Sequence, residues 1–224
     1  MHICLFDIDG TLLNTGGAGQ AAMEAALASE FDANRPIEGI STAGRTDRAI
    51  TADMFEYFGY ENNEQNWQRF LSSYLQHLPR HLAACEGAVL PGIPQLLVEL
   101  SARDDVLLGL LTGNYEQGAW LKLNYYQLSE HFGFGGFGDS QHHRNDVARE
   151  AYDKVGDHHD EPIDLNKLWV IGDTPADVEC GRAIGAKTIA VSTGMFSSDE
   201  LQPSNPDHLF ADFGETSTLL ELLF

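Results

Sequence analysis

A short apolar run that ends in two aspartates, close to the start of the chain, constrains the fold more than any other stretch. Residues 3–6 read Ile-Cys-Leu-Phe and are followed by Asp7-Ile8-Asp9. Such a run is typical of a buried parallel strand, where charges are expected only as the strand leaves the core. In open α/β sheets, ligands bind at that carboxyl end. Two carboxylates two positions apart point the same way on an extended chain and repel each other, so we expect a divalent cation beside them.

A turn is the alternative explanation for the end of this run. Asp and Gly are both common in turns, so Asp9-Gly10 could simply form an Asx-Gly turn after the strand. That explanation leaves Asp7 as an uncompensated charge at the end of an apolar strand. We therefore favour a functional site, for which other parts of the chain must supply partners.

Strands and helices alternate over the second half of the chain. Further strands are predicted at 106–111, 168–171 and 187–191, with a weaker, glycine-rich one at 132–137. Helices are predicted at 93–103, 115–128, 146–155, 177–184 and 215–223. This alternation indicates right-handed βαβ units, and hence an α/β fold with a parallel sheet.

The segment after the first strand breaks this alternation. Alanines among other good helix formers predict a helix at 20–31. Apolar residues three and four apart predict helices at 46–58 and 64–82, with Pro79 weakening the end of the last one. Residues 15–87, called the cap segment below, are therefore expected to form an all-helical inserted domain. The core domain is then expected to comprise residues 1–14 and 88–224, with glycines at 16–19 as one hinge.

The charge balance excludes several classes of partner. Thirteen basic and 34 acidic residues give a formal net charge of −21, which disfavours binding to nucleic acid or to an anionic membrane. The first apolar run is interrupted after a few residues and no window has the length of a membrane span, so we expect neither a signal peptide nor a spanning helix. Three widely spaced cysteines favour a reducing cytoplasm over a disulfide framework. An acidic enzyme and a protein-binding module both remain open on composition.

Polar clusters follow the predicted strands. Residues 112–114 (Thr-Gly-Asn) come directly after the strand at 106–111, and Asp173 and Asp177 follow the strand at 168–171. The carboxyl ends of parallel strands meet at one edge of a sheet, so these side chains should converge with Asp7 and Asp9. Oxygen ligands for a hard cation, together with hydrogen-bond donors, suit a phosphoryl group bound with Mg²⁺.

The same clusters carry a resemblance to a known family. Residues 7–13 (Asp-Ile-Asp-Gly-Thr-Leu-Leu) resemble the first motif of the haloacid dehalogenase-like hydrolases, residues 111–114 their second motif and residues 172–177 their fourth. The motifs occur in the family's order, and the cap segment stands where the phosphoglycolate phosphatase-like branch carries a helical cap. The resemblance implies a Rossmann-like core and Mg²⁺-dependent phosphoryl transfer through an aspartyl-phosphate.

The resemblance also implies roles for the carboxylates. Asp7 would be the nucleophile and a metal ligand. Asp9 would protonate the leaving oxygen and later deprotonate the attacking water, and its backbone carbonyl would also reach the metal. Asp173 would complete the Mg²⁺ site, and Asp177 would bind through water or orient its neighbours. The alternative for Asp173 and Asp177 is helix capping, which could explain one of them but hardly both.

The substrate phosphoryl group would be held by the first and second motifs. The resemblance implies that Thr112 and the amides of Gly113 and Asn114 bind phosphoryl oxygens, and that Gly10 and Thr11 also belong to the substrate-binding residues.

The third motif departs from the family's commonest pattern, which is a Lys or Arg before the helix that precedes the fourth-motif strand. The cations in this region are Arg144, Arg149, Lys154 and Lys167. Arg144 follows a glycine-rich stretch just before a predicted helix, so we expect it to reach the nucleophile and the phosphoryl group. Arg149 and Lys154 fall inside that helix, where solvent-facing roles are expected.

The best candidate for substrate contact in the cap segment is Gly44-Arg45-Thr46-Asp47, since Arg45 could bind a substrate carboxylate or phosphate. The alternative is that Thr46 or Asp47 caps the helix and Arg45 pairs with a surface acid.

Together these features predict a phosphatase, monomeric or homodimeric, that acts on a small phosphorylated metabolite such as phosphoglycolate. Asp9 argues against a dehalogenase, since a departing halide needs no proton. Residues 14–87 contain no lysine, which argues against imine-forming phosphonate hydrolysis. A sugar-phosphate mutase on the same site stays open, as does a non-catalytic regulator that binds a protein partner.

Overall fold

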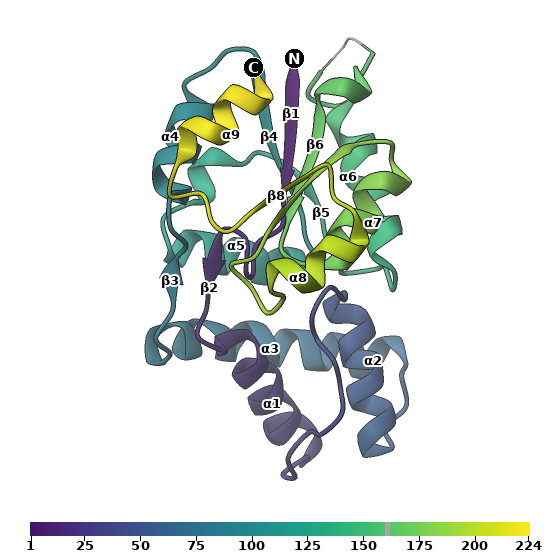
Figure 1. Cartoon of the computed structure of the whole chain (residues 1–224). Coiled ribbons are helices and arrows are strands. Elements are labelled where there is room, and N and C mark those ends of the chain that lie inside the picture. Colours follow the sequence, from purple (N-terminus) through teal and green to yellow (C-terminus); the bar gives the residue numbers. More distant parts are fainter. Residues whose placement is uncertain (160–161) are drawn as a thin grey trace.

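A parallel sheet forms the centre of the molecule (Figure 1). The structure, a computed structural model, describes residues 1–159 and 162–224. Within these residues the sheet has six strands in the order β5-β4-β1-β6-β7-β8, and every neighbouring pair is parallel. The strands are β1 (His2–Phe6), β4 (Val106–Leu111), β5 (Gly135–Gly136), β6 (Leu168–Gly172), β7 (Lys187–Val191) and β8 (His208–Phe210).

Helices cover both faces of the sheet (Figure 1). One face carries α4 (Ile93–Ser101), α5 (Glu116–Tyr125) and α9 (Thr216–Leu223), and the other carries α6 (Arg144–Val155) and α7 (Pro175–Ala183). A short helix α8 (Ser198–Leu201) precedes β8, and 3-10 turns lie at Ser129–His131, Leu165–Lys167 and Gln202–Ser204. The α/β class and the Rossmann-like core expected from the sequence are confirmed.

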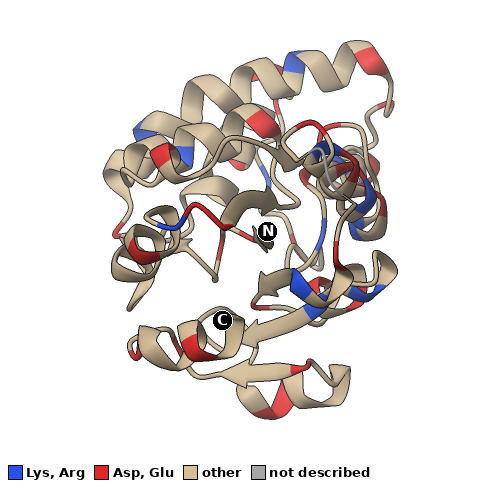
Figure 2. Cartoon of the chain, turned by 90° about the horizontal axis from the view of Figure 1, so that it is seen from above, with Lys and Arg blue, Asp and Glu red and all other residues tan. Residues whose placement is uncertain are grey.

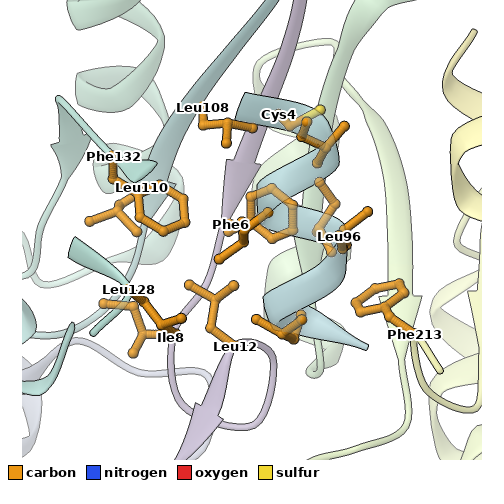
Figure 3. Packing of buried hydrophobic residues seen from close by; sticks show 14 of the residues in the cluster. Cys4, Phe6, Ile8, Leu12, Leu96, Leu108, Leu110, Leu128, Phe132 and Phe213 are labelled. Atoms are coloured by element: carbon orange, nitrogen blue, oxygen red, sulfur yellow. The ribbon is translucent and has the colours of Figure 1, made fainter. Parts of the chain in front are cut away.

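Strand β1 has apolar side chains on both faces, so both faces of the sheet must be covered by helices. Cys4 and Phe6 point into the cluster under α4 and α5, shown in Figure 3, whereas Ile3 and Leu5 point into the cluster under α6 and α7. Phe6 is level with Leu110 of β4 and Ile171 of β6. The residues that follow these three strands therefore emerge together at one edge of the sheet.

The cap segment lies beyond that edge (Figure 1). It contains α1 (Ala18–Phe31), α2 (Asp47–Phe58) and α3 (Glu64–Ala84), which share an apolar cluster that includes Phe55, Phe70 and Tyr74 and also Tyr115 of the core domain. Where the chain enters and leaves the segment, β2 (Leu13–Asn14) pairs antiparallel with β3 (Ala88–Val89). The proposed domain boundaries fall beside this pair of two-residue strands.

Local differences from the expected elements have physical reasons. The strand expected at 132–137 is reduced to β5, where a side chain at Gly135 would collide with Leu110. Helix α3 continues through Pro79, because the buried Leu78 and Leu82 on either side of it hold the helix against its neighbours. β2, β3 and β8 were not expected from the sequence.

The surface agrees with the composition. Figure 2 shows acidic positions, in red, spread over many elements rather than gathered on one. In the part of the chain that the structure describes, every helix is too short or too polar to cross a membrane.

Candidate active site

A cavity of about 340 Å³ opens between the carboxyl edge of the sheet and the cap segment. Its walls on the cap side include α1 residues and the loop 42–45 before α2. The charged and amide side chains on its sheet side include Asp7, Asp9, Asn114, Lys122, Arg144 and Asp173. The structure thus brings the first, second and fourth motifs together around one space.

Three buried carboxylates form the deepest part of the site. Asp7, Asp173 and Asp177 each offer an oxygen, and these oxygens lie within 4.8 Å of one another. Burial raises the pKa of Asp7 to about 7, although Arg144 opposes the shift. Burial, with the charges of Asp177 and Asp7, raises the pKa of Asp173 to about 9. Crowded oxygen ligands with too little positive charge among them are the donor set that a hard divalent cation requires.

Arg144 supplies the positive charge that the protein itself brings to this group. It is the first residue of α6 rather than the residue before it, and its side chain is 7% exposed. Nη1 and Nη2 donate to Asp7 Oδ1 at 3.3 and 3.4 Å, Nη2 donates to the Leu111 carbonyl at 3.2 Å, and the guanidinium pairs with Asp177. Arg149, weighed for the same role, instead pairs with Asp146 on the surface.

Asp177 combines a structural contact with its place in the site. Thr174 is the N-cap of α7, and Asp177 completes the capping box by accepting from the Thr174 amide at 3.0 Å and its hydroxyl at 2.7 Å. The other oxygen of Asp177 holds Arg144. Of the two roles expected for Asp177, these contacts favour orientation of neighbours. Asp173 is not a cap, so the capping alternative accounts for only one of the two carboxylates.

Asp9 stands apart from the three buried carboxylates. Its side chain is 40% exposed, and Oδ2 accepts hydrogen bonds from Lys122 Nζ at 2.6 Å and from Asn114 Nδ2 at 2.8 Å. Lys122 comes from α5 and was missed, because cations were sought near the third motif and in the cap segment but not in this helix. The available signal was its helical spacing, since Lys122 falls on the same buried face as Ala119 and Leu123.

The second motif lies beside both carboxylate groups. Thr112 is fully buried, and its hydroxyl accepts from Asn114 Nδ2 at 2.8 Å and from the Asn114 amide at 3.3 Å. Gly113 and Asn114 line the cavity directly. A side chain at position 113 would collide with the Arg45 carbonyl of the cap segment, so glycine permits this close approach.

The first motif continues along the Asp173 side. Gly10 lines the cavity with φ at +87°, and a side chain there would strike Asp173. Thr11 is buried and donates to Asp173 Oδ1 at 3.3 Å, so it supports a carboxylate instead of facing the cavity. The loop after β7 was missed: Thr193 donates to the Gly10 carbonyl at 2.6 Å, and Gly194 lies against Asp173. Its place after a predicted strand was the available signal.

Arg45 lines the cavity, but its charge is directed elsewhere. Nη1 donates to Asp53 Oδ2 at 2.5 Å and to the Ser41 carbonyl at 3.2 Å. Thr46 is the N-cap of α2, as one of the alternatives stated. The pairing with an acid that was weighed against substrate contact is therefore present in this structure.

The residue after that cap anchors the loop to the core. The Asp47 amide donates to the Gly113 carbonyl at 2.7 Å, and Asp47 Oδ2 accepts from the Tyr115 amide at 2.9 Å. Burial raises the pKa of Asp47 to about 6. The start of α2 is thus held over the second motif.

Comparisons with known proteins agree with this architecture. The family model for haloacid dehalogenase-like hydrolases matches residues 4–191. No curated protein gives a significant match to the sequence. A hydrolase from Pseudomonas syringae superposes with a TM-score of 0.74 at 19% identity, covering 100% of this chain and 99% of its own. A predicted phosphoglycolate phosphatase from Haemophilus somnus 129pt gives 0.72 at 17% identity, with 98% of each chain covered. A proposed β-phosphoglucomutase from Bacteroides vulgatus gives 0.69 at 20% identity, covering 100% of this chain and 88% of its own.

Proposed function

The chain belongs to the haloacid dehalogenase-like hydrolases, and from this premise we propose that it is a Mg²⁺-dependent phosphatase that hydrolyses a small phosphate monoester through an aspartyl-phosphate on Asp7. The observation that carries the proposal is the division between the two aspartates of the first motif. Asp7 is buried against Arg144, whereas Asp9 reaches into the open cavity beside it. A nucleophile and a proton donor are the two groups that this reaction needs.

In the first step, an oxygen of Asp7 attacks phosphorus and the bond to the ester oxygen breaks. Arg144 donates to Asp7 Oδ1, so its positive charge lies beside the nucleophile and offsets the charge of the phosphoryl group that Asp7 attacks. Asp9 gives its proton to the departing alkoxide. In the second step, Asp9 takes a proton from water, whose oxygen attacks the phosphorus and releases phosphate and Asp7.

The metal site fits the residues present. Asp7 and Asp173 would hold Mg²⁺ together with the backbone carbonyl of Asp9, and Asp177 would orient Arg144 beside them. A bound divalent cation supplies positive charge that offsets the charge on the phosphoryl oxygens.

The cavity supports a small substrate. Its volume of about 340 Å³ accommodates a phosphoryl group with a short leaving group. Phosphoglycolate is one candidate, for which Arg45 would have to exchange Asp53 for the substrate carboxylate. The unpaired state of Cys4, Cys85 and Cys180 supports a reducing compartment, and we place the protein in the cytoplasm.

A sugar-phosphate mutase is the second candidate. A mutase must exclude water from its phospho-aspartate, so a closed cap segment would be expected of it. The docking of Asp47 on Gly113 favours it, since that contact closes the cap segment over the second motif. The two candidates differ in the fate of the phosphoryl group, which a phosphatase releases as inorganic phosphate and a mutase returns to a sugar phosphate.

Phosphate release from a panel of phosphorylated metabolites, with Mg²⁺ or with EDTA, tests the proposal. We expect turnover only with Mg²⁺, its loss in Asp7→Asn, and full turnover in the surface control Asp104→Asn. Activity that persists in EDTA or in Asp7→Asn would overturn the mechanism. Transfer between sugar phosphates without phosphate release would favour the mutase, and no turnover of any ester would favour a non-catalytic regulator.

A further inference from the structure

Lys122 is a buried cation to which the reaction outlined above assigns no role. It projects from the buried face of α5, between Ala119 and Leu123, and its side chain is 5% exposed. Gly19 of α1 lies over its ammonium group, where a β-carbon would be 3.5 Å from Nζ. Burial of an ammonium costs free energy unless it is paired and hydrogen-bonded. Its partners therefore indicate what it is for.

Those partners belong to the acid side of the site. Nζ donates to Asp9 Oδ2 at 2.6 Å and also contacts Asn114 Oδ1. Asn114 closes the ring, because its Nδ2 donates to the same Asp9 Oδ2 at 2.8 Å and to Thr112 Oγ1 at 2.8 Å. Two donors, one from α5 and one from the loop before it, thus hold one oxygen of Asp9.

The other oxygen of Asp9 is left for the substrate. Among the hydrogen bonds of the described residues, none reaches Asp9 Oδ1, and the side chain is 40% exposed in the cavity. An ammonium and an amide N–H₂ are donors without acceptor capacity, so Oδ2 cannot present a proton to them. The proton that Asp9 transfers must then sit on Oδ1.

From this geometry we propose that Lys122 is a positioning residue, which fixes the carboxyl group of Asp9 so that Oδ1 faces the oxygen of the leaving group. The inference rests on the proposed phosphatase function. As Asp7 bonds to phosphorus, the electron pair of the breaking P–O bond goes to the leaving oxygen, which takes the proton from Oδ1. Asp9 is left as a carboxylate whose charge on Oδ2 is met by Lys122. Water returns the proton in the second step.

A role through Asp9 differs from a general structural role in its dependence on the leaving group. A poor leaving group needs the proton during P–O cleavage, whereas a good one departs with little help. Two aryl esters of similar size, p-nitrophenyl phosphate and p-methoxyphenyl phosphate, isolate this difference. The constant kcat/KM reports the steps up to departure of the phenol, so slow hydrolysis of the aspartyl-phosphate does not mask it.

The test compares Lys122→Met with the unaltered protein on both esters in saturating Mg²⁺. We expect kcat/KM to fall about 100-fold on the p-methoxyphenyl ester and less than about 10-fold on the p-nitrophenyl ester. Lys122→Arg should recover part of the loss on the poorer leaving group. Lys167→Met, which removes a lysine from the opposite edge of the sheet, should leave both constants unchanged.

A double substitution separates action through Asp9 from independent action. Asp9→Asn should show the same preference for the better leaving group, and adding Lys122→Met to it should cost little more, because the two residues form one unit. Urea unfolding establishes that each variant is folded. If Lys122→Met does not fold, Lys122→Gln, which keeps an amide donor, carries the same comparison with a smaller differential loss.

Each other outcome overturns a specific claim. Equal losses on the two esters, or none, would overturn the positioning role of Lys122 while leaving the phosphatase intact. A rise in KM alone would make Lys122 a substrate-binding residue. Fully additive losses in the double variant would show that it does not act through Asp9. Failure of the unaltered protein to hydrolyse any ester would overturn the proposed function, and this inference with it.

Discussion

The carboxyl edge of the sheet and the cap segment differ in how deeply their charged side chains are buried. At the edge, Asp7 and Asp173 are buried together, and burial, with the charge of Asp177, raises the pKa of each well above its ordinary value. In the cap segment Asp47 is buried and accepts from the Tyr115 amide, but the other charged residues include three ion pairs that each have at least one exposed partner. These are Arg45–Asp53, Arg48–Glu64 and Arg69–Glu30.

This difference indicates that the edge of the sheet carries the catalytic groups, whereas the cap segment encloses the substrate. A group of buried carboxylates with too little counter-charge lowers stability unless something binds there, so such a group is kept for function. Exposed ion pairs contribute little to stability and can exchange partners at small cost. Substitutions at the edge should therefore change the rate of the chemical step, and those in the cap segment should change which ester is accepted.

The largest effect should come from removing a ligand of the proposed metal site. Asp173→Asn should lower kcat/KM about 10³-fold or more, because the charge stabilisation that a bound cation provides is worth several kcal/mol. A Mg²⁺ titration of phosphate release should also shift to higher concentrations. Asp199→Asn, on the exposed α8, is the matched control. Unchanged Mg²⁺ dependence in Asp173→Asn would remove that residue from the metal site.

A smaller but still large effect should follow from Arg144→Met. We expect kcat to fall about 10²- to 10³-fold, as for the loss of one donor to a developing charge. Stability should fall by about 3–5 kcal/mol, because Asp177 would lose its buried partner. Arg144→Lys should recover stability more than rate. The ammonium restores a positive charge beside Asp177, but it cannot hold Asp7 and Asp177 together as the guanidinium does. Equal recovery of both in enzyme assays and urea unfolding would contradict this distinction.

In the metal-free protein, the repulsion among the buried carboxylates should appear as a pH dependence of the free energy of unfolding. In the folded chain the pKa of Asp7 is raised to about 7 and that of Asp173 to about 9, above their value of 3.8. The folded state then binds more protons than the unfolded state between about pH 4 and pH 9, so the free energy of unfolding should decrease as pH rises through that window. Urea unfolding in EDTA measures this slope.

Added Mg²⁺ should recover stability most at the alkaline end, where the carboxylates are ionised. Asp173→Asn should flatten the slope in EDTA. A slope that is unchanged in that variant would place the crowding elsewhere in the molecule.

Much of the edge could be predicted because its signals are local. Each apolar run marks a strand, and the polar residues after residues 3–6, 106–111 and 168–171 must emerge where those strands end. Arg144 could be found for a similar reason, since it stands at the start of a helix on the same edge.

Other contacts depend on tertiary packing that a linear pattern does not contain. Lys122 lies two turns into α5 and reaches Asp9 only because that face of the helix packs on the sheet. Thr193 and Gly194 belong to the loop after β7, whose path back to Gly10 has no sequence motif. For Arg45, the choice between Asp53 and a substrate is made by side-chain rotamers over the cavity.

The smallest effect, and the sharpest test of the division, should be at Arg45. Replacing it with Ala removes an ion pair whose side chains are 32% and 43% exposed, so stability should change by less than about 1 kcal/mol. If the cap segment selects the ester, Arg45→Ala should raise KM for a carboxylate-bearing ester such as phosphoglycolate about 10-fold, with kcat and the KM of p-nitrophenyl phosphate little changed. Arg69→Ala, which breaks a similar exposed pair with Glu30 away from the cavity, is the control. A loss of kcat in Arg45→Ala without a change in KM would make the cap segment part of the chemistry and remove the contrast between the two regions.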